Sequence, residues 1–250
     1  MINVLRENFT LNRKSRVLDL GSGTGQIALK LAPHVSEVIA IDPQEEMLQE
    51  GKRLAAARRL ANIRWLSGDS AALSSMAVQI GDIDCTVIAR AFHWMNREQT
   101  LRDLYKIIRK DGGIAVIVDS GPLDDPEIRW KEVTIQTVKL WLGKQRKAGT
   151  SGTYTHPLKR HHEILSESDF HGLKSVSINI ERTWTVERII GYLYSTSYTS
   201  LPVLGDKREP FEADLRKKLT GLEPTGRFKE SVKVNIIMVW KSLPATRKPY

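Results

Sequence analysis

The stretch VLDLGSGTGQIALKLA, residues 17–32, passes from an apolar run into glycines at every second position and then into a helical pattern. The apolar run is typical of a buried strand. Gly21, Gly23 and Gly25 permit a sharp turn and let a ligand contact bare backbone. The next helix would present its N-terminal amides to that ligand. The stretch therefore predicts a ligand-binding turn between a strand and a helix.

The spacing of these glycines helps to distinguish the ligand. A dinucleotide fingerprint reads GxGxxG, with an acid about 20 residues further on. Here Gly25 comes one place early, and Gln26 stands where the fingerprint has its last glycine. The shift argues against a pyrophosphate cradle, so a nicotinamide dehydrogenase is the disfavoured alternative.

Acidic residues accompany the first three predicted strands. Asp19 lies in the first, Asp42 ends the second, and Asp69 ends the third. Asp42 could accept hydrogen bonds from ribose hydroxyls, and Asp69 could accept one from an adenine amino group. Each is alternatively a turn or helix cap, positions that Asp favours. Because the carboxyl ends of parallel strands share one edge, the three acids together favour an adenosine ligand.

Strands and helices alternate through the first half of the chain, which is the signature of an open parallel sheet with helices on both faces. Right-handed crossovers place the first strand centrally. The second half has a long amphipathic helix, a polar His-rich stretch, and strand patterns that return near the end. The predicted strands are 16–20, 37–42, 63–69, 83–91, 114–119, 173–185 and 231–241, and the longest predicted helices are 43–61, 97–110 and 126–149.

The formal net charge of the 250 residues is +9, and the second half carries most of it. A solvated basic surface is the ordinary explanation. Alternatively, the charge attracts an anionic substrate or nucleic acid. Basic residues of the predicted lid that could pair with carboxylates are Arg129, Lys131, Lys139, Lys144, Arg146 and Lys147.

Composition points to the cytoplasm and to no metal site. No run approaches the 18 or so apolar residues of a membrane span, and MINVLRENFT lacks a signal pattern. Cys85 is the single cysteine, so it has no partner for an internal disulfide. The remaining candidate ligands do not show a usual metal-ligand spacing. They are His156, His161, His162 and His171.

The motifs VLDLGSGTG, IDPQEEML, LSGDS and DCTVIARAFHWM, in that order, resemble the class I S-adenosylmethionine-dependent methyltransferases. AFHWM is similar to the trans-aconitate methyltransferase-like small-molecule subgroup. The resemblance implies a Rossmann-like, doubly wound, mostly parallel seven-stranded sheet with an antiparallel last strand. We expect one domain over 1–250. It would comprise a cofactor-binding half at 1–121, a helical lid insertion after strand five at 122–172, and a C-terminal part at 173–250 that completes the sheet and substrate pocket.

The resemblance also implies roles for particular residues. Asp19 would orient the amino group of S-adenosylmethionine, and the glycine turn would face its methionine part. Asp42 would hold the ribose. The implied cofactor-binding set is Asp19, Gly21, Ser22, Gly23, Gly25, Asp42, Pro43, Met47, Asp69, Ser70, Arg90 and His93.

His93 is the candidate catalytic residue, because a near-neutral imidazole could take a proton from a substrate oxygen or nitrogen. Alternatively, His93 and Trp94 only shape the pocket wall, since methyl transfer from a sulfonium can proceed by positioning alone. An already ionised carboxylate acceptor would need no base. We expect O-methylation of a carboxylate or hydroxyl on a small molecule.

Two other functions stay open. A sequence pI of 9.6 suggests an RNA or other nucleic-acid methyltransferase. However, ARAFHW replaces the Asn/Asp-Pro-Pro-aromatic motif of enzymes that methylate base amino groups. A cytosine-C5 methyltransferase would need a cysteine nucleophile at the end of this strand, and Cys85 lies inside the strand instead. A catalytically silent binding protein of the same fold is the other alternative, and the intact glycine turn and acids argue against it.

The N-terminal residues Ile2, Leu5 and Phe9 have helical spacing. They predict the last turns of a helix, of the kind that covers the cofactor in the resembling family. We expect this chain to bind the cofactor weakly, and restored upstream sequence to tighten binding. Alternatively, the lid at 126–170 does all the closing.

Overall fold

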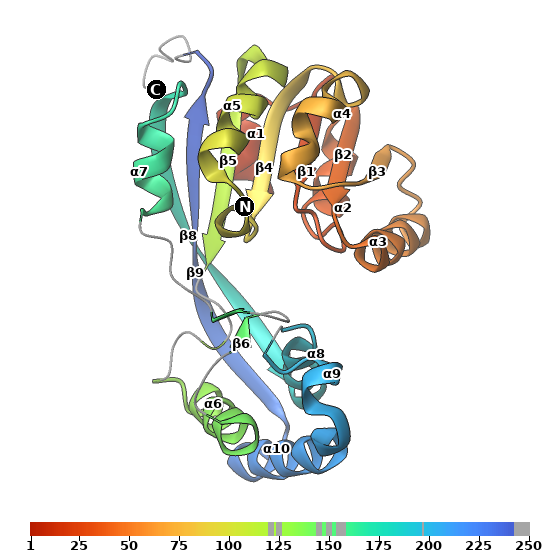
Figure 1. The fold of residues 1–250 in the computed structure, drawn as a ribbon, viewed down its shortest axis with the longest axis vertical. Helices are drawn as coiled ribbons and strands as arrows, with labels where there is room; N and C mark the ends of the chain where they lie inside the picture. The colour runs from red at the N-terminus through yellow and green to blue at the C-terminus, as the bar shows by residue number, and fades with distance from the viewer. Residues whose placement is uncertain are drawn as a thin grey trace. The chain divides into compact units, whose positions relative to one another are not determined.

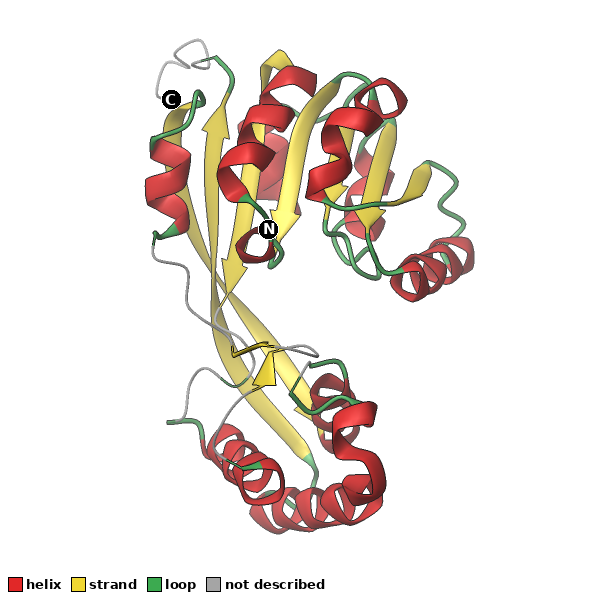
Figure 2. Ribbon diagram, viewed as in Figure 1, coloured by secondary structure: helices red, strands yellow, loops and turns green. Residues whose placement is uncertain are grey.

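A computed structural model describes residues 1–119, 123, 127–143, 147–148, 152–153, 159–196 and 198–242. Its main feature is a seven-stranded sheet in the order β3-β2-β1-β4-β5-β9-β8 (Figures 1 and 2). The strands are β1 (Arg16–Leu20), β2 (Glu37–Asp42), β3 (Ile63–Ser67), β4 (Ile83–Ala89), β5 (Ile108–Asp119), β8 (His171–Thr185) and β9 (Arg227–Trp240). The predicted α/β class and seven-stranded sheet are confirmed.

The strand directions follow the expected pattern. β1 pairs in parallel with both β2 and β4, and parallel pairing extends to β3 and β5. The arrow of β9 points opposite to those of β5 and β8 (Figure 1). Strand order reverses at β1 and β4, and ligands of such sheets bind in the crevice outside the carboxyl ends of the strands at this point.

Helices connect the parallel strands and differ in length from the predictions. The predicted helix 97–110 stops at Ile107, because Ile108 pairs with Ile83 and begins β5. The predicted helix 43–61 covers only Glu45–Ala57. α1 (Ile2–Phe9) precedes β1. The connecting helices are α2 (Ala28–Leu31), η1 (Ala32–His34), α3 (Glu45–Ala57), η2 (Ser70–Ala72), α4 (Leu73–Ile80), η3 (Phe92–Trp94) and α5 (Arg97–Ile107).

The chain divides into two compact units. Unit 1 comprises Met1–Val118, Pro157–Ile178 and Asn235–Tyr250, and unit 2 comprises Asp119–His156 and Asn179–Val234. The division into a cofactor-binding half, a lid and a C-terminal part stays a prediction.

Unit 1 is built on the parallel strands. β1, β2 and β4 are largely buried, as parallel strands with both faces covered require, whereas the edge strand β3 is half-buried. Leu18, Leu20 and Ile39 are fully buried in its core. The N-terminal residues form α1 as predicted. Phe9 of α1 packs on the Trp240 ring with 5.4 Å between the ring centroids, so this helix buries its apolar side.

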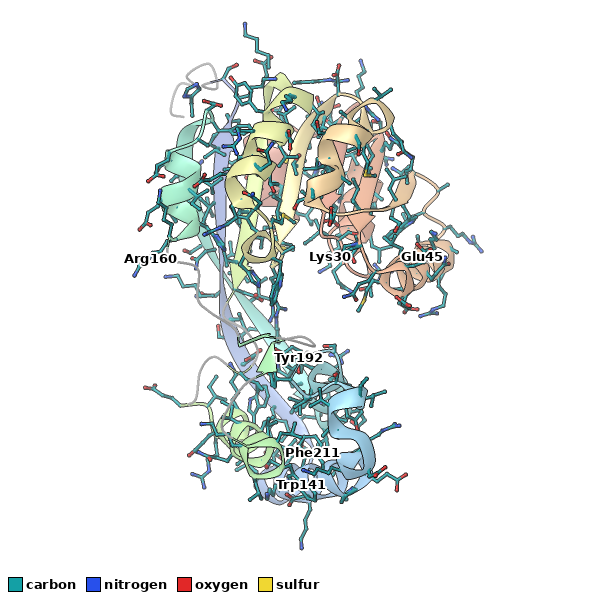
Figure 3. All side chains as sticks on the ribbon, in the orientation of Figure 1. Lys30, Glu45, Trp141, Arg160, Tyr192 and Phe211 are labelled. Atoms are coloured by element: carbon teal, nitrogen blue, oxygen red, sulfur yellow. The ribbon has the colours of Figure 1, made fainter. Side chains whose placement is uncertain are left out.

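Unit 2 has a separate apolar core between helices. Trp141 lies edge-on to the buried Phe211 ring, and its Nε1 donates to Asp214 at 2.8 Å (Figure 3). The helices around this core are α6 (Arg129–Leu142), α8 (Val186–Tyr194), α9 (Leu201–Leu204), η4 (Gly205–Lys207) and α10 (Arg208–Leu222).

The predicted helix 126–149 is represented by α6, which ends at Leu142. Lys147 and Ala148 form a short strand, β6, which pairs antiparallel with β7 (Gly152–Thr153). The predicted charges at Lys144 and Arg146, and the predicted ligand His156, lie outside the described residues, as does the Lys147 side chain. None of the helices in the described ranges has the length and apolar character needed to cross a bilayer.

Candidate functional site at the carboxyl ends of β1, β2 and β4

The glycine turn follows β1 directly and is held by β2. The amides of Gly21 and Ser22 donate to the carbonyl of Ile41 at 2.8 and 3.0 Å. Gly21, Gly23 and Gly25 have φ values of 71°, 54° and 75°, in the left-handed region that favours glycine. The turn predicted from the sequence is therefore present between a strand and a helix.

The three glycines have different surroundings. A Cβ on Gly21 would collide with the Cβ of Ala91, which follows β4, and a Cβ on Gly25 would collide with the Trp65 ring. A Cβ on Gly23 would have no atom within 4 Å. Gly21 and Gly25 thus allow close packing, whereas Gly23 exposes its backbone to open space.

Asp42 supports this turn from the end of β2. Its Oδ2 accepts the Gly23 amide at 2.8 Å, and its Oδ1 accepts the Gln44 amide at 3.0 Å. The side chain is buried. Asp42 therefore holds the turn before α3, the turn alternative raised from sequence, and it also fixes the backbone of Gly23, a contact that the sequence did not predict.

Asp19 lies beneath the turn and is almost completely buried. Its Oδ2 accepts the Ala28 amide at 2.9 Å, whereas its Oδ1 has no hydrogen-bond partner among the described residues. Burial raises the pKa of Asp19 to about 7, opposed by the Ala28 amide and reinforced by the charge of Asp42. The buried Ser22 Oγ also lacks a partner in the described part of the chain. Buried polar groups are normally paired, so these two atoms indicate a place for a polar ligand.

Asp69 plays a different part. It caps η2, with its Oδ1 accepting the amides of Ala71 and Ala72 at 2.9 and 3.1 Å, and it is exposed. Its capping role is thus what the structure shows. The other predicted adenine contacts are surface groups near the same edge, since Pro43 is exposed, and Met47 and Ser70 are half-buried.

The turn after β4 carries the remaining predicted residues. Arg90 has a φ of 57°, and its amide donates to the Ile117 carbonyl of β5 at 3.0 Å. His93 is half-buried, with its ring 4.8 Å from the ring of Trp94, and Trp94 is 67% exposed. Burial, and then the cations Arg90 and Arg97, lower the pKa of His93. His93 is therefore mainly neutral at pH 7.

The amino edge of the sheet gives a useful contrast, because its charges are paired. Glu37 accepts hydrogen bonds from Arg16 at 2.7 and 2.9 Å and from Arg64 at 2.9 Å. Burial acts to raise the pKa of Glu37, but these two guanidinium groups lower it overall. Asp84 pairs with Arg109 at 2.9 Å. The partnerless carboxylate oxygen of Asp19 belongs instead to the carboxyl edge, where a ligand is expected.

Sequence reasoning missed two neighbours of the site. The Trp65 ring of β3 packs where both Gly25 and Gly51 lack a side chain, which explains a glycine inside α3. His161 comes from a distant segment and lies 5.3 Å from the Phe92 ring. A glycine inside a strong helix pattern was the only sequence signal for the first, and the second had none.

Neither a metal centre nor a thiolate nucleophile emerges from the structure. Within the described ranges, no group of three or more His, Cys, Asp or Glu side chains is arranged to hold a metal ion. Cys85 is buried inside β4, and burial, followed by the charge of Asp84, raises the pKa of its thiol well above the usual value. A buried neutral thiol is a poor nucleophile.

Comparisons with known proteins agree with this geometry. A family model described as a methyltransferase domain matches residues 17–112, which include the glycine turn and the β4 turn. An uncharacterized methyltransferase-like protein of Schizosaccharomyces pombe is 26% identical over 215 residues, covering 84% of this chain and 75% of its own. The probable S-adenosylmethionine-dependent methyltransferase CRG1 of Saccharomyces cerevisiae is 34% identical over 116 residues, 46% of this chain and 39% of its own.

The family match and these relatives support a class I S-adenosylmethionine-dependent methyltransferase, with the matched domain at residues 17–112. Solved structures support the fold of this methyltransferase. The YcgJ protein of Bacillus subtilis matches with a TM-score of 0.54 at 18% identity, covering 96% of this chain and 97% of its own. A putative type II methyltransferase from Anaeromyxobacter dehalogenans matches with a TM-score of 0.57 at 18% identity, covering 96% and 94%. The methyltransferase family match and the names of the relatives imply S-adenosylmethionine as the methyl donor; the likeness to the trans-aconitate subgroup stays a prediction.

Proposed function

We propose that this methyltransferase transfers the methyl group of S-adenosylmethionine to an oxygen of a small molecule, a carboxylate or a hydroxyl. The observation that carries the cofactor assignment is the pair of buried atoms without described partners, Asp19 Oδ1 and Ser22 Oγ, at the glycine turn whose Gly23 faces open space. An ammonium group could donate to the first, and a polar tail could bond to the second and to backbone amides. The residues present therefore fit the cofactor.

The assignment of individual residues follows from this fit. Asp19 would hold the amino group, and Asp42 would hold the ribose hydroxyls while it braces Gly23. Bound S-adenosylmethionine supplies a methyl group on a sulfonium, which a nucleophile attacks in line. Contacts to the rest of the cofactor are assigned to the methionine part (Gly21, Ser22, Gly23, Gly25), the adenine (Pro43, Met47, Asp69, Ser70) and the neighbourhood of the methyl group (Arg90, His93).

An acceptor that bears a negative charge fits the surroundings of His93. After burial, the cations Arg90 and Arg97 lower the pKa of His93. Arg97 donates to neutral atoms, the Lys159 carbonyl at 2.9 Å and His161 Nδ1 at 3.4 Å. A carboxylate would compensate this charge by charge-assisted hydrogen bonds. One relative supports a small acceptor in general, since its name is demethylmenaquinone methyltransferase.

Ligand-induced stabilisation and methyl transfer test the proposal together. S-adenosylmethionine at a hundred times its dissociation constant should stabilise the chain by about 2.7 kcal/mol, whereas NAD should have no effect. With a radiolabelled methyl donor, label should move to carboxylic acids or alcohols in a metabolite panel.

The panel also includes ribosomal and transfer RNA. Label that moves only to RNA would support the nucleic-acid alternative. Stabilisation by the cofactor without label transfer to any acceptor would support the silent binding protein, and stabilisation by NAD alone would contradict the cofactor assignment.

The affinity for S-adenosylmethionine should depend on pH through Asp19. An ammonium partner favours the ionised carboxylate, so binding below pH 7 releases a proton, and affinity should fall by about tenfold per pH unit below 7. The free protein should show the opposite trend. Because the folded-state pKa of about 7 lies above the ordinary value of 3.8, the contribution of Asp19 to stability is lost as pH rises toward 7. Calorimetry in buffers of different ionisation enthalpy measures the released proton.

Asp19→Asn is the control for this linkage. The amide keeps the shape of the side chain but does not titrate, so affinity should fall by about 1.5–3 kcal/mol at pH 8 and lose its dependence on pH. A wild-type affinity that is constant from pH 6 to pH 8 would contradict the role assigned to Asp19.

A further inference from the structure

A short helix of unit 1, α7 (His161–Ser166), brings His161 to the turn after β4. The imidazole lies 5.3 Å from the ring of Phe92, with an angle of 51° between the ring planes. Phe92 is fully buried and begins η3, the same turn of helix that carries His93. His161 therefore packs on the segment that presents the candidate catalytic residue.

A second contact links His161 to the start of α5. Its Nδ1 lies 3.4 Å from Nη1 of Arg97. A guanidinium can only donate, so Nδ1 must accept, and the ring proton of the neutral form then sits on Nε2. Burial, followed by the charges of Arg97, His93 and His162, lowers the pKa of His161 to about 4. At pH 7 the ring is therefore neutral and able to accept this hydrogen bond.

α7 itself is firmly anchored in unit 1. Ile164 and Leu165 are buried in the core, and the Arg160 amide donates to Glu163 Oε2 at 3.1 Å, as in a capping box. His162, the residue after His161, shares a hydrogen bond of 3.0 Å with Ser175 of β8. His161 thus has a fixed support from which to hold its two partners.

The turn that it holds also contacts the glycine turn. Ala91 packs where Gly21 has no Cβ, and Met95 Cε comes within 3.4 Å of the same position. His93 lies between these two contacts in sequence. The cations Arg90 and Arg97 lower the pKa of His93, and a proton on His93 would lower the pKa of His161.

We propose that His161 is a positioning residue for the acceptor side of methyl transfer, which packs on Phe92 and binds Arg97 and thereby fixes the turn that carries His93. The proposal rests on the proposed function, because that function defines which side of the site receives the acceptor. His161 is assigned no contact with the substrate or the cofactor.

The test measures the titration of His93 by NMR of the imidazole C–H groups, with the signal assigned by comparison with His93→Gln. In His161→Ala, the packing on Phe92 and the acceptor for Arg97 are both lost, so the turn that carries His93 is no longer held. Greater exposure of His93 to water should raise its pKa toward its usual value of about 6.5. Turnover with an acceptor from the metabolite panel should fall on the order of tenfold, because small displacements of reacting groups are costly. The affinity for S-adenosylmethionine should be unchanged.

A second variant guards against a folding defect, and a third is the matched control. His161→Phe keeps a ring against Phe92 but removes the acceptor for Arg97, so the pKa of His93 should rise by less than in His161→Ala. His171→Ala removes an exposed imidazole at the start of β8 and should leave the titration of His93 unchanged.

An unchanged titration of His93 in both His161 variants would overturn the positioning role. This outcome does not depend on the methyl acceptor, since the NMR titration is made on the free protein. Failure of the proposed function would instead show as the absence of stabilisation by S-adenosylmethionine in the wild-type chain.

Discussion

Replacing Lys131 by Met should lower the free energy of unfolding by about 3–5 kcal/mol, because it leaves a buried carboxylate without its counter-ion. The ammonium of Lys131 lies 2.7 Å from Oε2 of Glu230, and the two side chains are only 3% and 0% exposed. Glu230 Oε2 makes no hydrogen bond within the described residues, so its attraction to Lys131 is ionic. Glu230 Oε1 also accepts from Trp184 Nε1 at 2.6 Å, which holds the carboxylate in place.

Two further variants make this prediction specific. The double change Lys131→Met with Glu230→Gln should recover most of the lost stability, since the amide oxygen still accepts from Trp184 and no charge stays buried. Arg53→Met breaks an exposed ion pair with Glu50 and should have little effect. Denaturant unfolding followed by tryptophan fluorescence measures all three. Equal losses for Lys131→Met and Arg53→Met would show that burial of the Lys131 pair is not what matters.

The second large effect concerns the glycine turn, where neighbouring glycines should respond differently to alanine. Gly21→Ala should lower the free energy of unfolding by about 2–5 kcal/mol. Overpacking against Ala91 contributes about 1–3 kcal/mol, and the left-handed backbone contributes about 1–2 kcal/mol. Gly23→Ala meets no atom within 4 Å, so only the backbone cost applies.

For the affinity for S-adenosylmethionine, unlike for stability, the larger effect is expected at Gly23. The methyl group of Gly23→Ala would occupy the open space beside the amide that Asp42 fixes. The affinity for S-adenosylmethionine should therefore fall at least about tenfold, or about 1.4 kcal/mol. Gly205→Ala is the matched control. Gly205 also has a positive φ, 49°, and open surroundings, but it lies in unit 2. It should show a similar loss of stability and no loss of affinity. Full affinity in Gly23→Ala would contradict the assigned site.

Much of the fold was predictable because its signals are local. A parallel strand buried on both faces needs a run of apolar residues, such as those that end in Leu20 and Ile41. An amphipathic helix needs apolar residues at helical spacing. The turn at Gly21 to Gly25 was equally visible, since positive φ values select glycine wherever the chain turns sharply. Element ends were less well predicted. Ile108 follows a helical pattern in sequence, yet it pairs with Ile83 and joins β5.

The site was predicted only in part. The positions of Asp19, Asp42 and His93 near the carboxyl edge follow from strand order, which alternation of strands and helices implies. The state of each side chain does not follow. Both oxygens of Asp42 bind backbone amides, one oxygen of Asp69 caps η2, and one oxygen of Asp19 has no partner among the described residues. In sequence the three residues look alike, since each is an Asp at or near the end of a strand. Their hydrogen bonds differ because folding brings different backbone amides near each carboxylate.

The sequence by itself determined the class of the sheet, the glycine turn, the edge at which the acids gather, and the family motifs. Tertiary structure alone decided that Ala91 closes on Gly21, that Trp65 requires Gly25 and Gly51, and that Lys131 pairs with Glu230. It also decided that His161 supports the turn of Phe92 and His93. The physical reason is the distance along the chain over which each effect acts. Periodicity, turns and caps act over a few neighbouring residues, whereas collisions, buried ion pairs and shifted pKa values arise between residues that meet only after the chain has folded.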